Sequence, residues 1–180
     1  MKILTTSLTL VFLMGACATA DITQPPISVT PKDPRAAVGV DMYGRSRAAG
    51  AQVPRFRGQD MVQVRTNGSR DGEGYGEIVG SQCSLDSGLY TASFQTPANI
   101  VVPDYGPDSP ALFVMCTAPD GRTKSVTAGA VNLTSQARNA SAAGTGILGA
   151  IIIGAVNESR RDNETDDFGY NLITLPFPAK

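Results

Sequence analysis

The chain has 180 residues, of which 42% are hydrophobic and 17% charged, and its formal net charge is −1. This length suits one domain with a modest core, and the near-neutral charge argues against a protein that binds nucleic acid. Histidine is absent, which removes the side chain best suited to acid–base catalysis near neutral pH and the commonest metal ligand. We therefore expect no enzyme, no metal site and no cofactor.

The first sixteen residues have the three parts of a secretory signal peptide. Lys2 supplies a positive charge, residues 3–14 form a short apolar run, and small residues follow. The apolar run is too short to span a bilayer as a permanent anchor. Residues 1–16 are therefore predicted to be removed on export, which places the rest of the chain in a cell envelope.

Two cleavage sites compete at the end of this segment. Residues 13–17, Leu-Met-Gly-Ala-Cys, resemble a bacterial lipobox, where cleavage precedes a cysteine that then carries acyl chains such as palmitate. This reading predicts lipidation at Cys17, and Ala18 after it resembles a signal for the outer membrane, facing the periplasm. The alternative is the A-x-A sequence of residues 18–20, which would release a soluble periplasmic or secreted chain beginning at Asp21.

The cysteine count agrees with export. There are three cysteines, and either cleavage route leaves Cys83 and Cys116 as an even pair in an oxidising compartment. We expect these two to form a disulfide. The closed loop would stabilise the fold by roughly 3–4 kcal/mol.

The residues after Cys17 are rich in proline. Four prolines fall between residues 25 and 34, and apolar periodicity is absent there. Proline favours an extended, semi-rigid chain, so residues 17–37 are predicted to be the lipidated cysteine and a tether. Residues 38–180 then form a single β domain, whose first part, 38–58, is expected to be mostly irregular.

Short strands between turn signals dominate the chain from residue 60. The expected strands cover residues 60–66, 77–84, 89–96, 99–102, 111–117 and 122–133. Residues 111–117 are continuously apolar, which is typical of a strand covered on both faces. The pattern predicts a mainly β protein, a small antiparallel β-sandwich with one Gly/Ala-rich helix near the C-terminus.

Part of this region resembles a known family. The residues that carry the resemblance are Gly80-Ser81-Gln82-Cys83, Thr96-Pro97-Ala98, Val101-Val102 and Leu112-Phe113-Val114-Met115-Cys116. They look like the core of PEGA-like domains of bacterial lipoproteins over about residues 77–130, although the tetrapeptide that names the domain is absent. The resemblance implies a small β module with a structural or envelope-binding role rather than a catalytic one.

Residues 139–157 carry no charge and are expected to form the helix. Small residues recur there every four positions, at Ala142, Gly146, Ala150 and Gly154. On a helix they form one smooth stripe that lets another backbone approach closely. The stripe could pack on its own domain, mediate self-association, or belong to a membrane-inserted segment, and we rank insertion last.

These features together predict an outer-membrane lipoprotein with a non-catalytic structural or binding β domain. Its expected partners are the membrane, through the lipid anchor, and either another envelope protein or a second copy of itself. The alternatives are a self-assembling envelope component that associates through the stripe and a soluble periplasmic protein.

Overall fold

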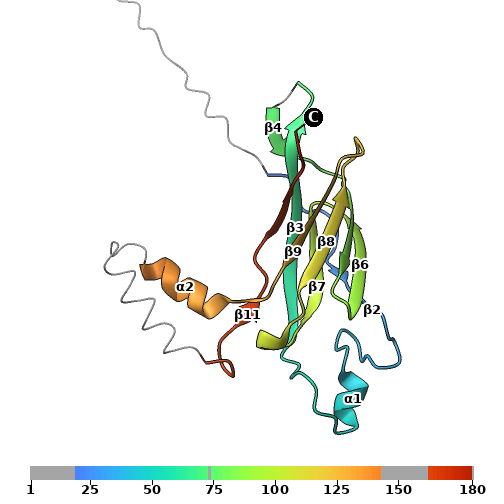
Figure 1. Cartoon of the computed structure of the whole chain (residues 1–180), viewed down its shortest axis with the longest axis vertical. Coiled ribbons are helices and arrows are strands. Elements are labelled where there is room, and N and C mark those ends of the chain that lie inside the picture. The colour runs from blue at the N-terminus through green and yellow to red at the C-terminus, as the bar shows by residue number, and fades with distance from the viewer. Residues whose placement is uncertain (1–18, 73, 143–161, 180) are drawn as a thin grey trace, which may run out of the picture.

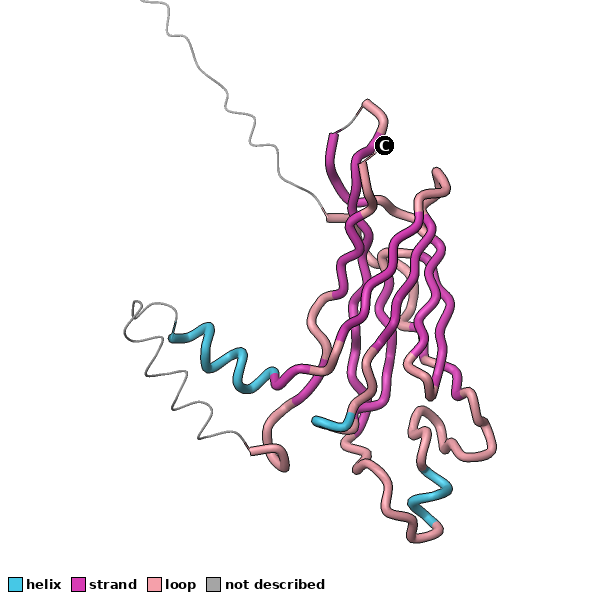
Figure 2. Tube along the Cα trace, in the orientation of Figure 1, coloured by secondary structure: helices cyan, strands magenta, loops and turns pink. Residues whose placement is uncertain are grey.

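The computed structural model describes residues 19–72, 74–142 and 162–179. Most of its regular structure is strand, and the strands form two five-stranded sheets that pack face to face (Figures 1 and 2). The prediction of a mainly β protein with sandwich packing is confirmed.

The first sheet has the strand order β1-β7-β3-β12, and β4 pairs with the C-terminal part of β3. Its strands are β1 (Ile27–Ser28), β3 (Gly58–Arg70), β4 (Gly74–Glu77), β7 (Ala98–Asp104) and β12 (Ile173–Pro176). The central pairing of β3 with β7 and the β3–β4 hairpin are antiparallel. The two outer pairings, β1 with β7 and β12 with β3, are parallel, so this sheet is mixed rather than purely antiparallel.

The second sheet has the order β2-β6-β5-β8-β9 and is antiparallel throughout. Its strands are β2 (Thr30–Pro31), β5 (Gln82–Asp86), β6 (Tyr90–Gln95), β8 (Leu112–Thr117) and β9 (Thr123–Ala128). One strand had been expected over residues 77–84, but the structure has two, because the chain turns between β4 and β5. Gly80 lies in this turn with a φ of +80°, which glycine adopts without strain.

The core lies between the sheets and follows the alternation of each strand. Val62 and Val64 of β3 and Leu112 and Val114 of β8 are fully buried, and they belong to one cluster that draws on both sheets. Side chains at alternate positions point to opposite faces of a strand, so the intervening residues are turned outward.

Strand β8 differs from its prediction in this respect. The apolar run was expected to be covered on both faces, but Phe113 and Met115 are 45% and 46% exposed. They alternate with buried residues, and their side of the strand faces away from the core. A continuous apolar run therefore contains one inward row and one outward row of side chains here.

The proline-rich segment is also arranged differently from the expected tether. In its described part, β1 joins the first sheet and β2 joins the second, and Val29 between them is only 5% exposed. Pro31 is accommodated because β2 is an edge strand, where a missing N–H costs little. Residues 20–31 are thus part of the sandwich.

The remaining elements lie outside the two five-stranded sheets. They are α1 (Gly44–Ala48), the 3-10 helix η1 (Gly106–Asp108), α2 (Leu133–Ala142) and the two-stranded ladder of β10 (Val131–Asn132) with β11 (Phe168–Gly169). Helix α1 lies at the end opposite β4 (Figure 1). In the described part of the chain, no helix is both long and apolar enough to cross a membrane.

Helix α2 is fixed to the segment before β11 by Asp166, whose residue is 6% exposed. Its carboxylate accepts hydrogen bonds from Asn132 Nδ2 at 2.6 Å and from Arg138 Nη2 at 3.0 Å. The Asn132 hydrogen bond, helped by the charge of Arg138, lowers the pKa of Asp166 below its ordinary value. The helix begins at residue 133, earlier than predicted, and residues 143–157 of the predicted helix lie outside the described residues.

Candidate functional site

An ion pair between β3 and β4 forms the centre of the candidate site. Arg65 Nη1 lies 2.6 Å from Glu77 Oε1, and the two side chains are only 14% and 10% exposed. Arg65 alternates with the buried residues of β3, so it projects from the outer face of the first sheet. A pair this well covered on an outer sheet face needs a covering segment, which the start of the described chain supplies.

Ala20 binds both members of this pair through its backbone. Its N–H donates to Glu77 Oε2 at 2.7 Å, and its carbonyl oxygen accepts from Arg65 Nη1 at 3.0 Å. Hydrogen bonds to charged groups contribute roughly 1.5–3 kcal/mol, more than those between neutral groups. The Arg65–Glu77 pair therefore forms a specific seat for the backbone of residue 20, which we call the Ala20 seat.

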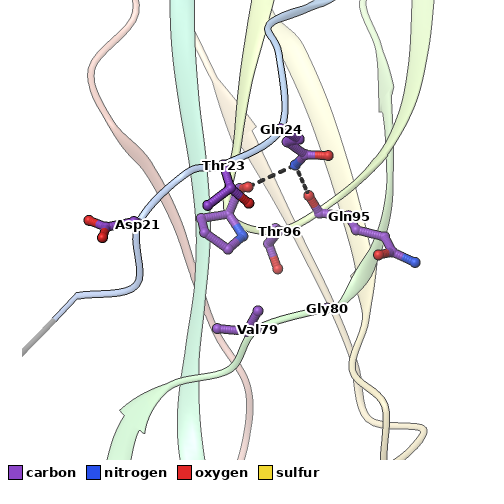
Figure 3. Close-up of a pocket in the computed structure, with 8 residues that line it drawn as sticks. Asp21, Thr23, Gln24, Val79, Gly80, Gln95 and Thr96 are labelled. Carbon is purple, nitrogen blue, oxygen red and sulfur yellow. Dashed lines mark hydrogen bonds between the residues drawn. The ribbon is translucent and has the colours of Figure 1, made fainter.

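Gln24 makes a second attachment, to the turn between β6 and β7. Its side-chain Nε2 donates to the carbonyl oxygens of Gln95 and Pro97, at 2.7 and 2.8 Å (Figure 3). These two carbonyls lie on either side of the cis Thr96–Pro97 peptide bond. The amide group of Gln24 thus holds the N-terminal segment against the turn at two points.

A hollow of about 280 Å³ lies between the N-terminal segment and this turn. Figure 3 shows the residues that line it, namely Asp21, Thr23, Gln24, Val79, Gly80, Gln95, Thr96 and Pro97. Apart from Asp21 these side chains are neutral, and they offer hydroxyl and amide groups. Such a lining can hydrogen-bond a neutral polar group, and it holds no nucleophile paired with a base.

A buried cluster of three hydroxyl groups supports the turn that borders the hollow. Thr66 Oγ1 lies 3.0 Å from Ser81 Oγ and 2.8 Å from Thr96 Oγ1, and it donates to the carbonyl oxygen of Ile78 at 2.6 Å. Thr66 and Ser81 are fully buried, and Thr96 is 2% exposed. The cluster joins β3, the β4–β5 connection and the β6–β7 turn, so it fixes the surface on which the N-terminal segment lies.

The predicted disulfide is present. Cys83 of β5 and Cys116 of β8 are directly opposite each other in the second sheet, with their Cα atoms 4.1 Å apart. Both cysteines are buried and belong to the core. The bond therefore links two neighbouring strands of one sheet and has a structural position.

The outer face of the second sheet carries the exposed apolar residues of β8. In the register of the sheet, Met115 lies between Ser84 of β5 and Ser125 of β9, and Phe113 lies between Asp86 of β5 and Thr127 of β9. We call these six residues the β8 face. Two large apolar side chains among hydroxyl groups and one carboxylate, which is paired with Lys32, form a surface suited to contact with another molecule.

The remaining predicted site residues have mixed outcomes. Cys17 lies outside the described residues, as do Gly146, Ala150 and Gly154 of the predicted stripe. Ala142 is the last residue of α2. Within residues 19–72, 74–142 and 162–179, no group of three or more acidic, cysteine or histidine residues is placed to hold a metal ion.

The Ala20 seat was not found from the sequence. Arg65 and Glu77 are charged residues in predicted strands, and such charged side chains are usually exposed to solvent. Their partner is a backbone that precedes Arg65 by 45 residues, and backbone groups carry no sequence signal. The one available clue was the position of Ala20, which lies between the two competing cleavage sites.

No known protein family, curated protein or solved structure matches this chain. The similarity to PEGA-like domains therefore stays a prediction from the residues quoted for it.

Proposed function

We propose that this protein is a bacterial envelope lipoprotein, held in the outer membrane by acyl chains on Cys17, with a β-sandwich that has a structural or binding role and no catalytic one. The observation that carries the proposal is the Ala20 seat. Here the covered Arg65–Glu77 pair binds both backbone polar groups of Ala20.

The two cleavage sites have opposite consequences for this seat. Cleavage before Cys17 keeps Ala20 in the mature chain, whereas cleavage after Ala20 removes it. Without Ala20, Arg65 and Glu77 each lose one hydrogen bond to the backbone, and hydrogen bonds to charged groups contribute roughly 1.5–3 kcal/mol each. The folded domain is thus more stable in a mature chain that retains Ala20. Lipoprotein processing, which cleaves before Cys17, produces such a chain.

Acylation of Cys17 would give a durable anchor. Each buried CH₂ group of an acyl chain contributes about 0.8 kcal/mol, so two or more chains hold a protein on a membrane stably. Ala18 after the cysteine supports sorting to the outer membrane. The β8 face supports a binding role for the domain, because its Phe113 and Met115 are exposed on an otherwise polar surface.

Intact mass spectrometry of detergent-extracted protein from a Gram-negative host tests this proposal. We expect a chain that begins at an acylated Cys17 and gains two hydrogens on reduction, when the Cys83–Cys116 bond opens. The matched control is Cys17→Ala, which should lose the acyl mass and leave the membrane fraction. A chain that begins at Asp21 would refute lipid anchoring and make the protein a soluble one.

A further inference from the structure

The short distance between Cys17 and the Ala20 seat determines which part of the domain meets the membrane. Cys17 precedes Ala20 by three residues, and an extended chain spans at most about 3.6 Å per residue. The Cα atom of Cys17 therefore lies within roughly 11 Å of Ala20. If Cys17 is acylated, as the proposed function holds, the surface beside the Ala20 seat must lie close to the lipid headgroups.

That surface is the β3–β4 hairpin. Glu77, which binds the N–H of Ala20, is the last residue of β4, and Tyr75 precedes it by two residues, or about 7 Å along the strand. Figure 1 shows β4 at one end of the sandwich, near the start of the described chain and opposite α1. The hairpin therefore lies at the end of the domain nearest the lipid anchor.

The exposed side chain of this hairpin suits a membrane interface. Tyr75 is 65% exposed, the most exposed of the large hydrophobic residues described. The guanidinium atoms of Arg70 lie 2.9–3.2 Å from the position that a Cβ on Gly76 would take, so this side chain covers the face of the strand opposite to Tyr75. Tyr75 itself projects from the same outer face as Glu77. Tyrosine is enriched where an apolar ring meets a polar headgroup layer.

We propose that the β3–β4 hairpin contacts the phospholipid headgroup region of the membrane that holds Cys17, with Tyr75 as its interfacial residue. One tyrosine binds lipid only weakly. The short connection to the acyl chains holds it at the surface, however, and a high effective concentration makes a weak contact persistent. The sandwich would then stand with its β4 end on the membrane and its α1 end away from it.

Single-tryptophan variants test this orientation directly, because the chain contains no tryptophan. The test variant is Tyr75→Trp. The matched control is Val38→Trp. The native Val38 is 60% exposed and lies beside Gly44 of α1, at the opposite end of the domain. Each acylated full-length protein is reconstituted into phosphatidylcholine vesicles whose acyl chains carry bromine near the headgroup, and its fluorescence is compared with that in unbrominated vesicles.

The expected result is that Tyr75→Trp loses about half of its fluorescence in brominated vesicles, whereas Val38→Trp is unchanged. Equal fluorescence of Tyr75→Trp in both kinds of vesicle, with the protein still floating with them, would overturn the hairpin contact and leave lipid anchoring intact. Quenching of both variants would overturn the upright orientation. Protein that does not float with the vesicles would overturn the proposed function itself.

An insertion tests whether the short connection positions the hairpin. About ten Gly and Ser residues between Ala18 and Thr19 leave the Ala20 seat in place but add a flexible spacer of roughly 15–20 Å. Quenching of Tyr75→Trp should fall towards that of the Val38→Trp control. Undiminished quenching would show that the connection does not position the hairpin, and would overturn this part of the inference.

Discussion

Removal of residues 18–20 should destabilise the domain only in a chain that keeps Arg65 and Glu77, the pair that binds the backbone of Ala20. The comparison uses two soluble chains that lack Cys17, one beginning at Ala18 and the other at Asp21. In the first, Ala20 N–H binds Glu77 and its carbonyl oxygen binds Arg65. In the second both bonds are lost.

The expected loss can be worked from these contacts. Two hydrogen bonds to charged groups are worth roughly 3–6 kcal/mol if each contributes about 1.5–3 kcal/mol. The new terminal ammonium of Asp21 lies one residue, or about 3.8 Å, further along the chain and recovers part of the interaction with Glu77. We therefore expect the chain that begins at Asp21 to be less stable by about 2 kcal/mol.

Urea unfolding measures this difference in stability. The control is the same truncation in a variant that lacks the Arg65–Glu77 ion pair. A loss of about 2 kcal/mol lowers the urea midpoint by roughly 1 M for a domain of this size. In the double variant Arg65→Met, Glu77→Leu, which replaces the pair by apolar side chains of similar length, the same truncation should cost less than about 0.5 kcal/mol. An equal cost in both backgrounds would refute the reasoning, because the truncation would then act without the ion pair.

Three further predictions concern other parts of the fold. Replacing both disulfide cysteines by alanine should lower the free energy of unfolding by about 3–4 kcal/mol, as measured by urea unfolding without reductant, and unchanged stability would contradict the structural position of the bond. The pKa of Asp166 is lower in the folded protein than its ordinary value of 3.8, so its contribution to stability is complete above that value and is lost as the pH falls through the folded pKa. Asp166→Asn should therefore weaken the loss of stability between about pH 4 and about pH 2, and an identical pH profile would exclude this role. The double variant Phe113→Ser, Met115→Ser should change the free energy of unfolding by less than about 1 kcal/mol, because both side chains are nearly half exposed, while reducing chemical crosslinking to envelope components. Undiminished crosslinking would show that the β8 face is not a binding surface.

The sequence predicted the strands well where the local pattern alone determines them. Val62 and Val64 alternate with polar residues, and they are fully buried in β3. The Cys83–Cys116 pair followed from a count of cysteines in a chain that is expected to be exported. Strand β8 shows the limit of such predictions. An unbroken apolar run does not reveal whether another segment covers its outward-facing residues, Phe113 and Met115.

The candidate site was harder to predict because its contacts are distant in sequence. Proline content indicated an extended chain for residues 20–31, and the chain there is indeed extended, but extension does not distinguish a free spacer from an edge strand. The difference depends on whether another strand offers its edge, as β7 does to β1 and β6 does to β2. The backbone partners of Arg65 and Glu77 were hidden for the same reason.

The passage of the N-terminal segment from one sheet to the other has a mechanical consequence. Strand β1 is paired with β7, and after Val29 strand β2 is paired with β6, so both layers hold this segment. If Cys17 is acylated as proposed, a force that pulls on it would act along the strands. The hydrogen bonds of the strand ladders would then be loaded in shear and would resist together rather than open one at a time. The contacts of Ala20 with Arg65 and Glu77, and those of Gln24 with the β6–β7 turn, would take this load first, before it reached the strand pairings of β1 and β2. A domain held in this way could transmit tension between the membrane and whatever its far end contacts without first peeling away from its own N-terminus.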